Sequence, residues 1–262
     1  MMGWPSLCLG DDIYVGCRLF LIGGGPITPA LDWSVVFATG SGGAFDATDI
    51  STLWQDVAGT IPVTAVGQSV ERMDDVSGQG QPFLKDGTRD VPIYTAVDGK
   101  GGLVFTQGGL TTPGMRSAGV NFSDSLPTWY GMAGRHPEVA ASGFLGGSNF
   151  GNRRHAIKIG TNFEWTMQRG TGSISDTFVS LDTGHTFQAW HEDAPELVTI
   201  SAPMFINGTI TEAKTMQRSD GTSSGAFSLY GVGGYVTHKA IGVSGDVPDA
   251  TQQAMIQSWL ET

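Results

Sequence analysis

An antiparallel all-β sandwich with one short helix at the C-terminal end is the fold class that this sequence predicts. Glycine supplies 39 of the 262 residues and charged residues make up 15 %, a composition that favours many turns over long charged helices. From about residue 91 onward, large apolar residues alternate with polar ones, as they do along strands that bury one face. The 13 Phe and 7 Trp residues supply apolar surface for a sizeable core, and at this length a single domain is expected.

The first 44 residues predict an attachment segment ahead of the main domain. Their apolar runs, IYVGCRLFLI and WSVVFA, are separated by glycine-rich joints at residues 23–26 and 40–43. We therefore expect residues 1–44 to attach the protein to a partner and residues 45–262 to form the sandwich. Cys8 and Cys17 lie in this segment and could close at most one local disulfide, whose redox state stays open.

The formal net charge of −11 argues against partners that bind clustered cations. Nucleic acids and anionic membranes attract mainly Lys and Arg, and the one small basic cluster, at residues 153–158, is expected to be a solvated loop. No stretch approaches the roughly 20 apolar residues of a membrane span, and no basic leader precedes the apolar run at residues 19–22. The sequence thus predicts that the protein neither binds nucleic acid nor inserts into a membrane. It also predicts synthesis in a reducing cytoplasm.

A short helix is expected directly after residue 48. The Asp49 side chain can accept the unpaired amide protons of a first helical turn that continues through Leu53 and Trp54. Gly59 stands where such a helix would end, because glycine readily adopts the left-handed conformation that follows a helix.

Strands dominate the following part of the chain. Residues 162–168 alternate polar and large apolar side chains, which predicts a strand with one buried face. A second alternating run covers residues 198–206, where Pro203 predicts an edge strand or a bulge. Asn207 and Gly208 follow it and predict a two-residue hairpin turn, because both residues tolerate positive φ.

The last segment changes to the period of a helix. Asp249 and Gln252 have the spacing of a capping box, in which each side chain bonds the backbone amide of the other. The apolar residues that follow lie on one helical face and predict packing on a sheet. They are Met255, Ile256, Trp259 and Leu260.

Residues 45–80, FDATDISTLWQDVAGTIPVTAVGQSVERMDDVSGQG, resemble the entry segment of tailed-bacteriophage and prophage virion proteins that carry a concanavalin A-like, laminin G-like jelly roll. The shared pattern is an acidic turn, a Pro-Val-Thr-Ala stretch and an Asp-x-Ser-Gly-x-Gly turn. The matching positions are Asp46, Asp49, Ile50, Ser51, Thr52, Leu53, Gln55, Asp56, residues 61–65, Asp75, Ser77, Gly78 and Gly80. The MFINGTI hairpin and the closing helix agree with the same family.

This resemblance implies a concanavalin A-like jelly-roll sandwich and a structural protein of the virion, synthesised in the host cytoplasm. Residues 1–44 would dock to other virion proteins, and the protein would be a homo-oligomer or present in many copies. Head or tail location, copy number and the glycan bound, if any, stay open. If the protein binds no glycan, the alternative is a purely architectural decoration protein.

Catalytic patterns in the sequence are weak, so we expect a protein without enzymatic activity. Residues 221–225 fit Gly-x-Ser-x-Gly but precede a strand, and residues 191–195 lack the second His of a zinc-protease helix. A polysaccharide-degrading enzyme is the alternative, since such an enzyme needs two nearby carboxylates and Glu192, Asp193 and Glu196 are the nearest candidates. No metal site and no cofactor are expected, while calcium held by loop carbonyls is left open.

Adhesion to host surface carbohydrate is the binding function that the sequence favours. Sugar rings pack their C–H faces on Trp or Tyr, and polar side chains bond their hydroxyl groups. Aromatic candidates are Trp129, Tyr130, Trp165 and Trp190, and the polar loop covers residues 147–155. The predicted carbohydrate-binding residues are Trp190, Asn149, Asn152 and Arg154.

Overall fold

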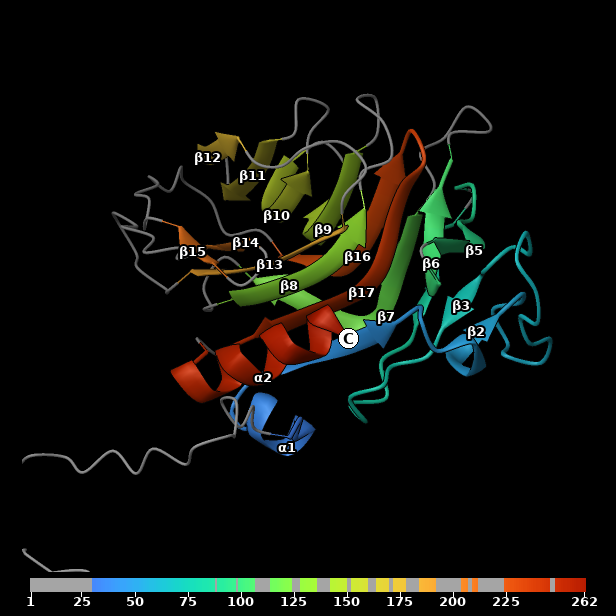
Figure 1. Cartoon of the computed structure of the whole chain (residues 1–262), viewed down its shortest axis with the longest axis horizontal. Coiled ribbons are helices and arrows are strands. Elements are labelled where there is room, and N and C mark those ends of the chain that lie inside the picture. The colour runs from blue at the N-terminus through green and yellow to red at the C-terminus, as the bar shows by residue number, and fades with distance from the viewer. Residues whose placement is uncertain are drawn as a thin grey trace, which may run out of the picture.

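The computed structural model describes most of the chain from residue 30 onward. The described residues are 30–87, 89–97, 99–106, 114–123, 128–135, 142–149, 152–159, 164–169, 172–177, 184–191, 204–206, 209–211, 224–245 and 248–262. Two antiparallel sheets pack face to face, and two helices cover the outside of one of them (Figure 1). This jelly-roll β-sandwich confirms the predicted fold class.

The first sheet, sheet A, has six strands. Along its path lie β13 (Gly184–His191), β8 (Thr128–Arg135), β17 (Tyr235–Ser244), β6 (Lys100–Phe105) and β5 (Ile93–Val97). Strand β1 (Ser41–Asp46) also pairs with β17, so the start of the described chain lies beside its end. This pairing of segments far apart in sequence closes the sandwich.

The second sheet, sheet B, has nine strands. In spatial order they are β12 (Gly172–Thr177), β11 (Glu164–Arg169), β10 (Asn152–Ile159), β9 (Ser142–Asn149), β16 (Ser224–Val232), β7 (Gly114–Ser123), β4 (Phe83–Lys85), β3 (Arg72–Met73) and β2 (Leu53–Trp54). Strand β11 confirms the predicted strand at residues 162–168. Strands β14 (Met204–Ile206) and β15 (Thr209–Thr211) pair around residues 207 and 208, which confirms the hairpin.

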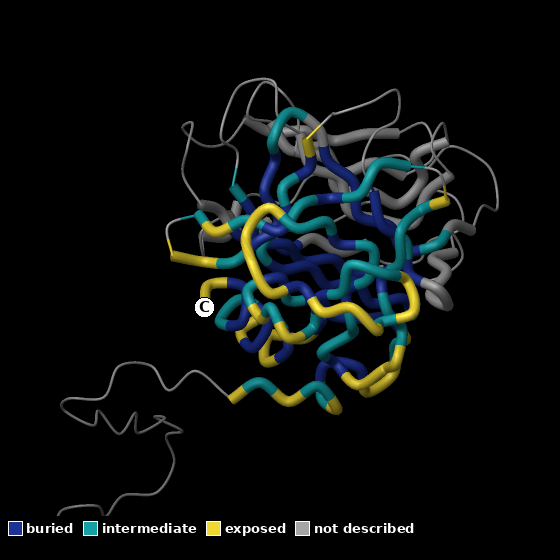
Figure 2. Tube along the Cα trace, turned by 90° about the vertical axis from the view of Figure 1, so that its right-hand side faces the viewer, coloured by how far each residue is buried: buried dark blue, intermediate teal, exposed yellow. Residues whose placement is uncertain are grey.

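Stacked aromatic rings form the core between the two sheets. Phe45 of sheet A stacks on Phe83 of sheet B with 3.8 Å between ring centroids. Phe227 of β16 lies 4.9 Å from Phe83 and 5.9 Å from Phe45. Figure 2 shows the buried residues gathered in the interior between the layers. Such large side chains stabilise the sandwich because each removes extensive apolar surface from water.

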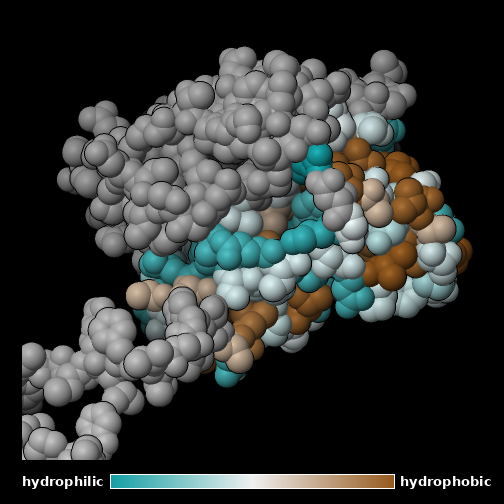
Figure 3. Space-filling view, in the orientation of Figure 1, coloured by the Kyte–Doolittle hydropathy of each residue, from teal (hydrophilic) through white to brown (hydrophobic). Residues whose placement is uncertain are grey.

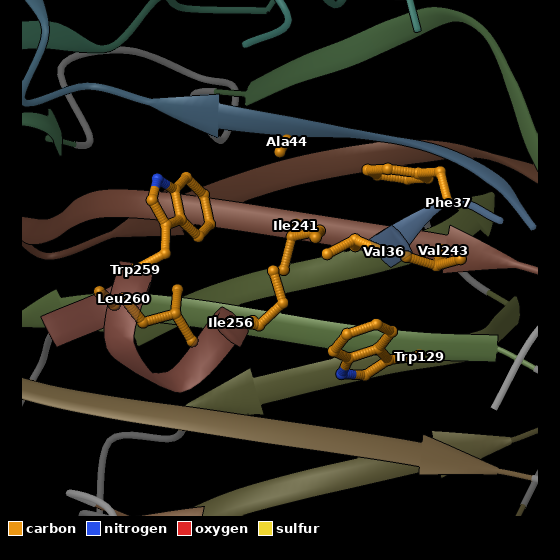
Figure 4. Close-up of a cluster of buried hydrophobic side chains, with 10 residues drawn as sticks. Val36, Phe37, Ala44, Trp129, Ile241, Val243, Ile256, Trp259 and Leu260 are labelled. Carbon is orange, nitrogen blue, oxygen red and sulfur yellow. The ribbon is translucent and has the colours of Figure 1, made fainter. Parts of the chain in front are cut away.

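Two helices cover the outer face of sheet A. Helix α2 (Ala250–Glu261) places Ile256, Trp259 and Leu260 on β8 and β17, while α1 (Trp33–Val36) adds Val36 beside them (Figure 4). The predicted capping box is confirmed: Asp249 accepts the amide proton of Gln252, and the Gln252 side chain accepts that of Asp249. Trp259 is only 8 % exposed, as its helical spacing predicts.

The helix predicted after residue 48 is wrong in its length. Asp49 does cap a turn, but the turn is a single 3-10 turn, η1 (Ile50–Thr52), and Leu53 and Trp54 then enter strand β2. Pairing of Leu53 with Met73 gives the fully buried Leu53 a place in the core, which one more helical turn would not provide. Gly59 has a φ of 73° in the turn that follows the strand rather than at a helix end.

Residues 30–44 are part of the sandwich, so the boundary expected at residue 44 falls inside the folded unit. Val36 and Phe37 are buried in the layer under α2, and β1 begins at Ser41. Glycine is required at Gly42 by close approach, because a Cβ there would overlap the carbonyl oxygen of Gly242. Cys8 and Cys17 lie outside the described residues.

Candidate functional site

Most acidic residues of the motif at residues 45–80 hold the backbone. Asp46, Asp49 and Asp75 each stand two residues before a Ser or Thr, and one carboxylate oxygen accepts both the amide and the hydroxyl proton of that residue at 2.5 to 3.0 Å. Asp32 makes the same turn ahead of α1. These Asp-turns are local substitutes for backbone hydrogen bonds, so their recurrence reflects folding rather than catalysis.

Asp75 extends this arrangement to long range. Besides Ser77, it accepts the amide protons of Ala44, in β1, and of Gly80, each at 2.9 Å. Ala44 is fully buried, so this carboxylate joins sheet A to the turn that follows β3. The Asp-x-Ser-Gly-x-Gly stretch is therefore a structural brace.

The outer face of sheet B offers a different set of side chains. Strand register places Leu53, Met73 and Phe83 side by side, and all three are buried in the core. Because side chains alternate along strands, the neighbouring positions face away from that core. We call these positions the outer row: Trp54, Arg72, Leu84, Arg116 and Ser228.

One end of the outer row combines an aromatic ring with an ion pair. The Trp54 indole N–H donates to one oxygen of Asp74 at 2.7 Å, and Arg72 Nε donates to the other at 2.7 Å. About a third of each charged side chain is exposed, and Trp54 is half-buried. Gly59 lies against the Arg72 guanidinium, so the loop after β2 further limits its movement. We call Trp54, Arg72 and Asp74 the tryptophan site.

Arg116 of the outer row belongs to a partly buried group of polar side chains that joins three strands. Asp86 accepts from Tyr230 at 2.6 Å, Arg89 at 2.9 Å and Arg116 at 3.1 Å, which links β4, β7 and β16. The Arg89 guanidinium lies 5.0 Å from the centre of the Tyr230 ring. Burial and the bond to Asp86 raise the pKa of Tyr230, so its hydroxyl remains protonated near neutral pH and serves as a donor rather than a nucleophile.

The residues predicted to bind carbohydrate are divided between the sheets. Trp190 lies in β13 of sheet A, opposite Trp129. Asn149 and Asn152 face each other across the β9–β10 hairpin of sheet B, and Arg154 lies at the irregular register of β10. The side chains of these four residues lie outside the described part of the structure. Two other aromatic candidates, Trp129 and Tyr130, are core residues.

Sequence reasoning missed the tryptophan site. Trp54 was expected in a helix, and no element was predicted for Arg72 and Asp74, so nothing brought the three residues together. The available signal was the Leu-Trp pair, in which a buried and a surface apolar residue alternate, followed by the charged run at residues 71–75.

Metal and membrane features are absent from the parts of the chain that the structure describes. No group of three or more His, Cys, Asp or Glu side chains is arranged there to hold a metal ion. Neither α1 nor α2 has the length and apolar character that crossing a bilayer requires, and no other helix among those residues does.

Several solved structures share this fold, although no family model and no curated protein matches the sequence. A mutant GH54 α-L-arabinofuranosidase soaked with 4-nitrophenyl α-L-arabinofuranoside is 13 % identical, with a TM-score of 0.59 over 88 % of this chain and 64 % of its own. A GH54 enzyme soaked with a cyclic sulfate inhibitor is 12 % identical, with a TM-score of 0.56 over 83 % and 62 %. An arabinofuranosidase complexed with arabinofuranosyl-α-1,2-xylobiose is 11 % identical, with a TM-score of 0.53 over 73 % and 50 %.

These similarities correct one expectation from the sequence. The chain was expected to lack enzymatic activity, yet three of the solved structures that share its sandwich are arabinofuranosidases. The expectation of a protein without enzymatic activity, which rested on weak catalytic patterns in the sequence, is therefore wrong. The chain spans less than two thirds of the length of these three enzymes, and at this identity they show a common fold alone.

Proposed function

We propose that this sandwich recognises carbohydrate through the tryptophan site on the outer face of sheet B. The observation that carries the proposal is the Trp54 ring, which Asp74 holds in one orientation beside Arg72. A sugar stacks the C–H face of its ring on an aromatic side chain, while carboxylate and guanidinium groups accept from and donate to its hydroxyls. The tryptophan site holds an aromatic ring, a guanidinium group and a carboxylate in contact with one another, and each charged side chain is about a third exposed.

Hydrolysis of a glycan is the second candidate function, and the sandwich shared with arabinofuranosidases favours it. Glycosidases need two carboxylates about 5 to 10 Å apart, one of them protonated. Most described carboxylates already serve backbone amides or cations, as Asp75 and Asp86 do. Glu192, Asp193 and Glu196 remain the candidate acids from the sequence, and they lie outside the described residues.

The bacteriophage particle is the setting that we propose for this domain. The support is the resemblance of residues 45–80 to virion proteins, with attachment through the N-terminal segment and display in several copies. On such a particle, the tryptophan site would bind a glycan of the host surface. Immunolabelling of purified particles, with lysate protein as the control, tests this setting. Failure to find the protein on particles contradicts it and leaves carbohydrate recognition standing.

Affinity electrophoresis and calorimetry with soluble polysaccharides, arabinan and arabinoxylan among them, test the binding proposal. We expect Trp54→Ala to weaken binding at least about tenfold, the size of effect that an aromatic anchor produces. Trp33→Ala removes another half-buried tryptophan, on the helix layer, and should leave binding unchanged. Equal loss in both variants, or no retained polysaccharide for the wild type, contradicts the proposal.

Release of 4-nitrophenol from 4-nitrophenyl α-L-arabinofuranoside tests the second candidate. If the chain is a hydrolase of this type, Glu192→Gln or Glu196→Gln should abolish release while binding persists. Absence of release from this substrate and from arabinan removes arabinofuranosidase activity from consideration.

A further inference from the structure

Two arginines lie in the outer row of sheet B, and none of the five residues of that row is acidic. Arg72 of β3 and Arg116 of β7 each pair with Leu84 of β4, so the arginines stand on either side of this leucine. Their side chains are 29 % and 41 % exposed. Figure 3 shows hydrophobic and hydrophilic surface side by side at the end of the molecule where Figure 1 places β2 and β3. The row thus presents exposed cations in a chain whose net charge is −11.

An aspartate holds each arginine by one nitrogen atom of its guanidinium group. Asp74 accepts from Arg72 Nε at 2.7 Å, and Asp86 accepts from Arg116 Nη2 at 3.1 Å. A guanidinium group carries five N–H donors in one plane, so a single carboxylate fixes its orientation and leaves other donors for a second carboxylate. Both arginines are therefore oriented in advance, which lowers the entropy lost when they bind a ligand.

The aspartate beside Arg116 does not cancel the positive charge that this arginine presents to solvent. The Asp86 side chain is 11 % exposed, whereas that of Arg116 is 41 % exposed, so the cation is far more accessible than its partner. Asp86 also pairs with Arg89, so one carboxylate is shared by two guanidinium groups. These three side chains together carry a net positive charge, with Arg116 as their most exposed member.

The spacing of the two arginines suits a chain of sugars rather than one sugar. Neighbouring strands lie about 4.8 Å apart, so Arg72 and Arg116, two strands apart, leave the sheet about 10 Å from each other. A pyranose ring is shorter than this separation, so the two guanidinium groups contact different sugars of one chain. The half-buried Leu84 between them offers an apolar surface to the C–H face of an intervening sugar.

We propose that the outer row binds polysaccharides whose sugars carry carboxylate groups, that is, polymers of uronic acids. This inference rests on the proposed function, that the outer face of sheet B binds carbohydrate. Trp54 and Arg72 supply stacking and polar contacts that a neutral sugar also uses. Arg116 adds the contact that selects for charge, because an arginine and a carboxylate form charge-assisted hydrogen bonds that are stronger than those to a neutral hydroxyl group.

Calorimetry on the full chain, with polygalacturonate and with its methyl ester, tests the proposal. Esterification removes the charge and keeps the sugar backbone, so we expect the acid form to bind at least about tenfold more tightly at low ionic strength. High salt should reduce this ratio, because it screens exposed charges. Arg116→Gln should bring the two affinities together, and Arg116→Lys, which keeps the charge but loses the planar group, should give an intermediate ratio.

Lys85→Gln is the matched control for the loss of one positive charge. Lys85 follows Leu84 in β4, so its side chain leaves the strand on the side away from the outer row. It is 31 % exposed and also forms an ion pair, with Glu71 at 3.3 Å. Its replacement should leave the ratio of the two affinities unchanged. Thermal melts show whether each variant is folded.

The inference and the proposed function can fail separately. If polygalacturonate binds no more tightly than its ester, or if folded Arg116→Gln keeps the wild-type ratio, the outer row does not select carboxylates. The effect of Trp54→Ala on neutral polysaccharides would still decide the proposed function. If Lys85→Gln lowers the ratio as much as Arg116→Gln, overall charge causes the preference and its assignment to the outer row is wrong. A ratio that depends on Arg116, with no effect of Trp54→Ala on either polymer, would contradict the tryptophan site and not the carboxylate contact.

Discussion

Replacement of Asp75 by alanine removes the acceptor of four hydrogen bonds, one of which joins the turn after β3 to strand β1 of sheet A. The carboxylate accepts from the amides of Ala44, Ser77 and Gly80 and from the Ser77 hydroxyl, over 2.6 to 3.0 Å. Alanine offers no acceptor, and water cannot reach the Ala44 amide because that residue is fully buried. The substitution therefore leaves a buried donor unpaired, which is a severe kind of hydrogen-bond loss.

The expected destabilisation follows from where each donor lies. Loss of a charged acceptor for the buried Ala44 amide costs about 1.5 to 3 kcal/mol. The Ser77 and Gly80 amides belong to one local turn, in which Ser77 is buried and Gly80 is exposed, and each bond to the carboxylate contributes about 0.5 to 1.5 kcal/mol. We expect Asp75→Ala to lower the free energy of unfolding by about 3 to 5 kcal/mol in total. Asp75→Asn keeps one oxygen acceptor, so its free energy of unfolding should lie between those of the wild type and of Asp75→Ala.

Urea denaturation followed by tryptophan fluorescence measures the effect. Asp49→Ala is the matched control: Asp49 makes the same local turn with Ser51, but it has no long-range partner among the described hydrogen bonds. Its loss should cost about 1 kcal/mol. An unchanged slope of the free energy against urea would show that the folded state keeps its compactness. If Asp75→Ala costs no more than Asp49→Ala, the carboxylate is not a brace between the sheets and the reasoning fails.

Three further predictions concern other parts of the fold. Trp259→Ala should lower the unfolding free energy by about 3 to 5 kcal/mol, and a change within error in urea titrations would mean that α2 does not pack as described. Deletion of residues 1–40 should cost about 3 kcal/mol more than deletion of residues 1–29, because it removes the buried Val36 and Phe37; equal melting curves would contradict this. Burial lowers the pKa of His238 below its ordinary value of 6.5, so the unfolded chain binds that proton more tightly and stability rises with pH up to about 6.5. His238→Gln should flatten that part of a plot of urea midpoint against pH, and an unchanged plot would exclude His238 as the cause.

The sequence predicted the elements whose signals are local. The hairpin of β14 and β15 and the Asp249–Gln252 capping box each depend on a few adjacent residues, and both predictions are confirmed. Long-range pairing decided the elements that were missed. Leu53 and Trp54 follow a capped turn that would suit a helix, yet they become a strand because Met73 offers a partner that no local rule reveals.

Glycine was the other source of error. Residues 40–43 read as a flexible joint, because glycine clusters usually separate elements. In the structure Gly42 and Gly43 lie within β1, where a side chain at Gly42 would overlap the backbone of β17. The same residue type serves close packing in one place and chain reversal in another, and only the tertiary contact distinguishes them.

The candidate site was harder to predict than the fold. Trp54 and Arg72 meet because β2 and β3 pair in a particular register, and strands of two residues are too short to show an alternating pattern. The predicted residues Trp190, Asn149, Asn152 and Arg154 were chosen for their chemistry alone. They belong to two different sheets, so they remain a prediction that the described geometry does not unite.

The indole N–H signal of Trp54 in a two-dimensional nitrogen–proton NMR spectrum tests the central claim most directly. Trp54→Phe identifies this signal, and titration with a polysaccharide that the protein retains then follows it alongside the signals of the buried Trp129 and Trp259. If a sugar stacks on the tryptophan site, the Trp54 signal shifts and saturates at the concentration where calorimetry saturates, while the two buried signals stay in place. Saturable polysaccharide binding that leaves the Trp54 signal unmoved would contradict the account.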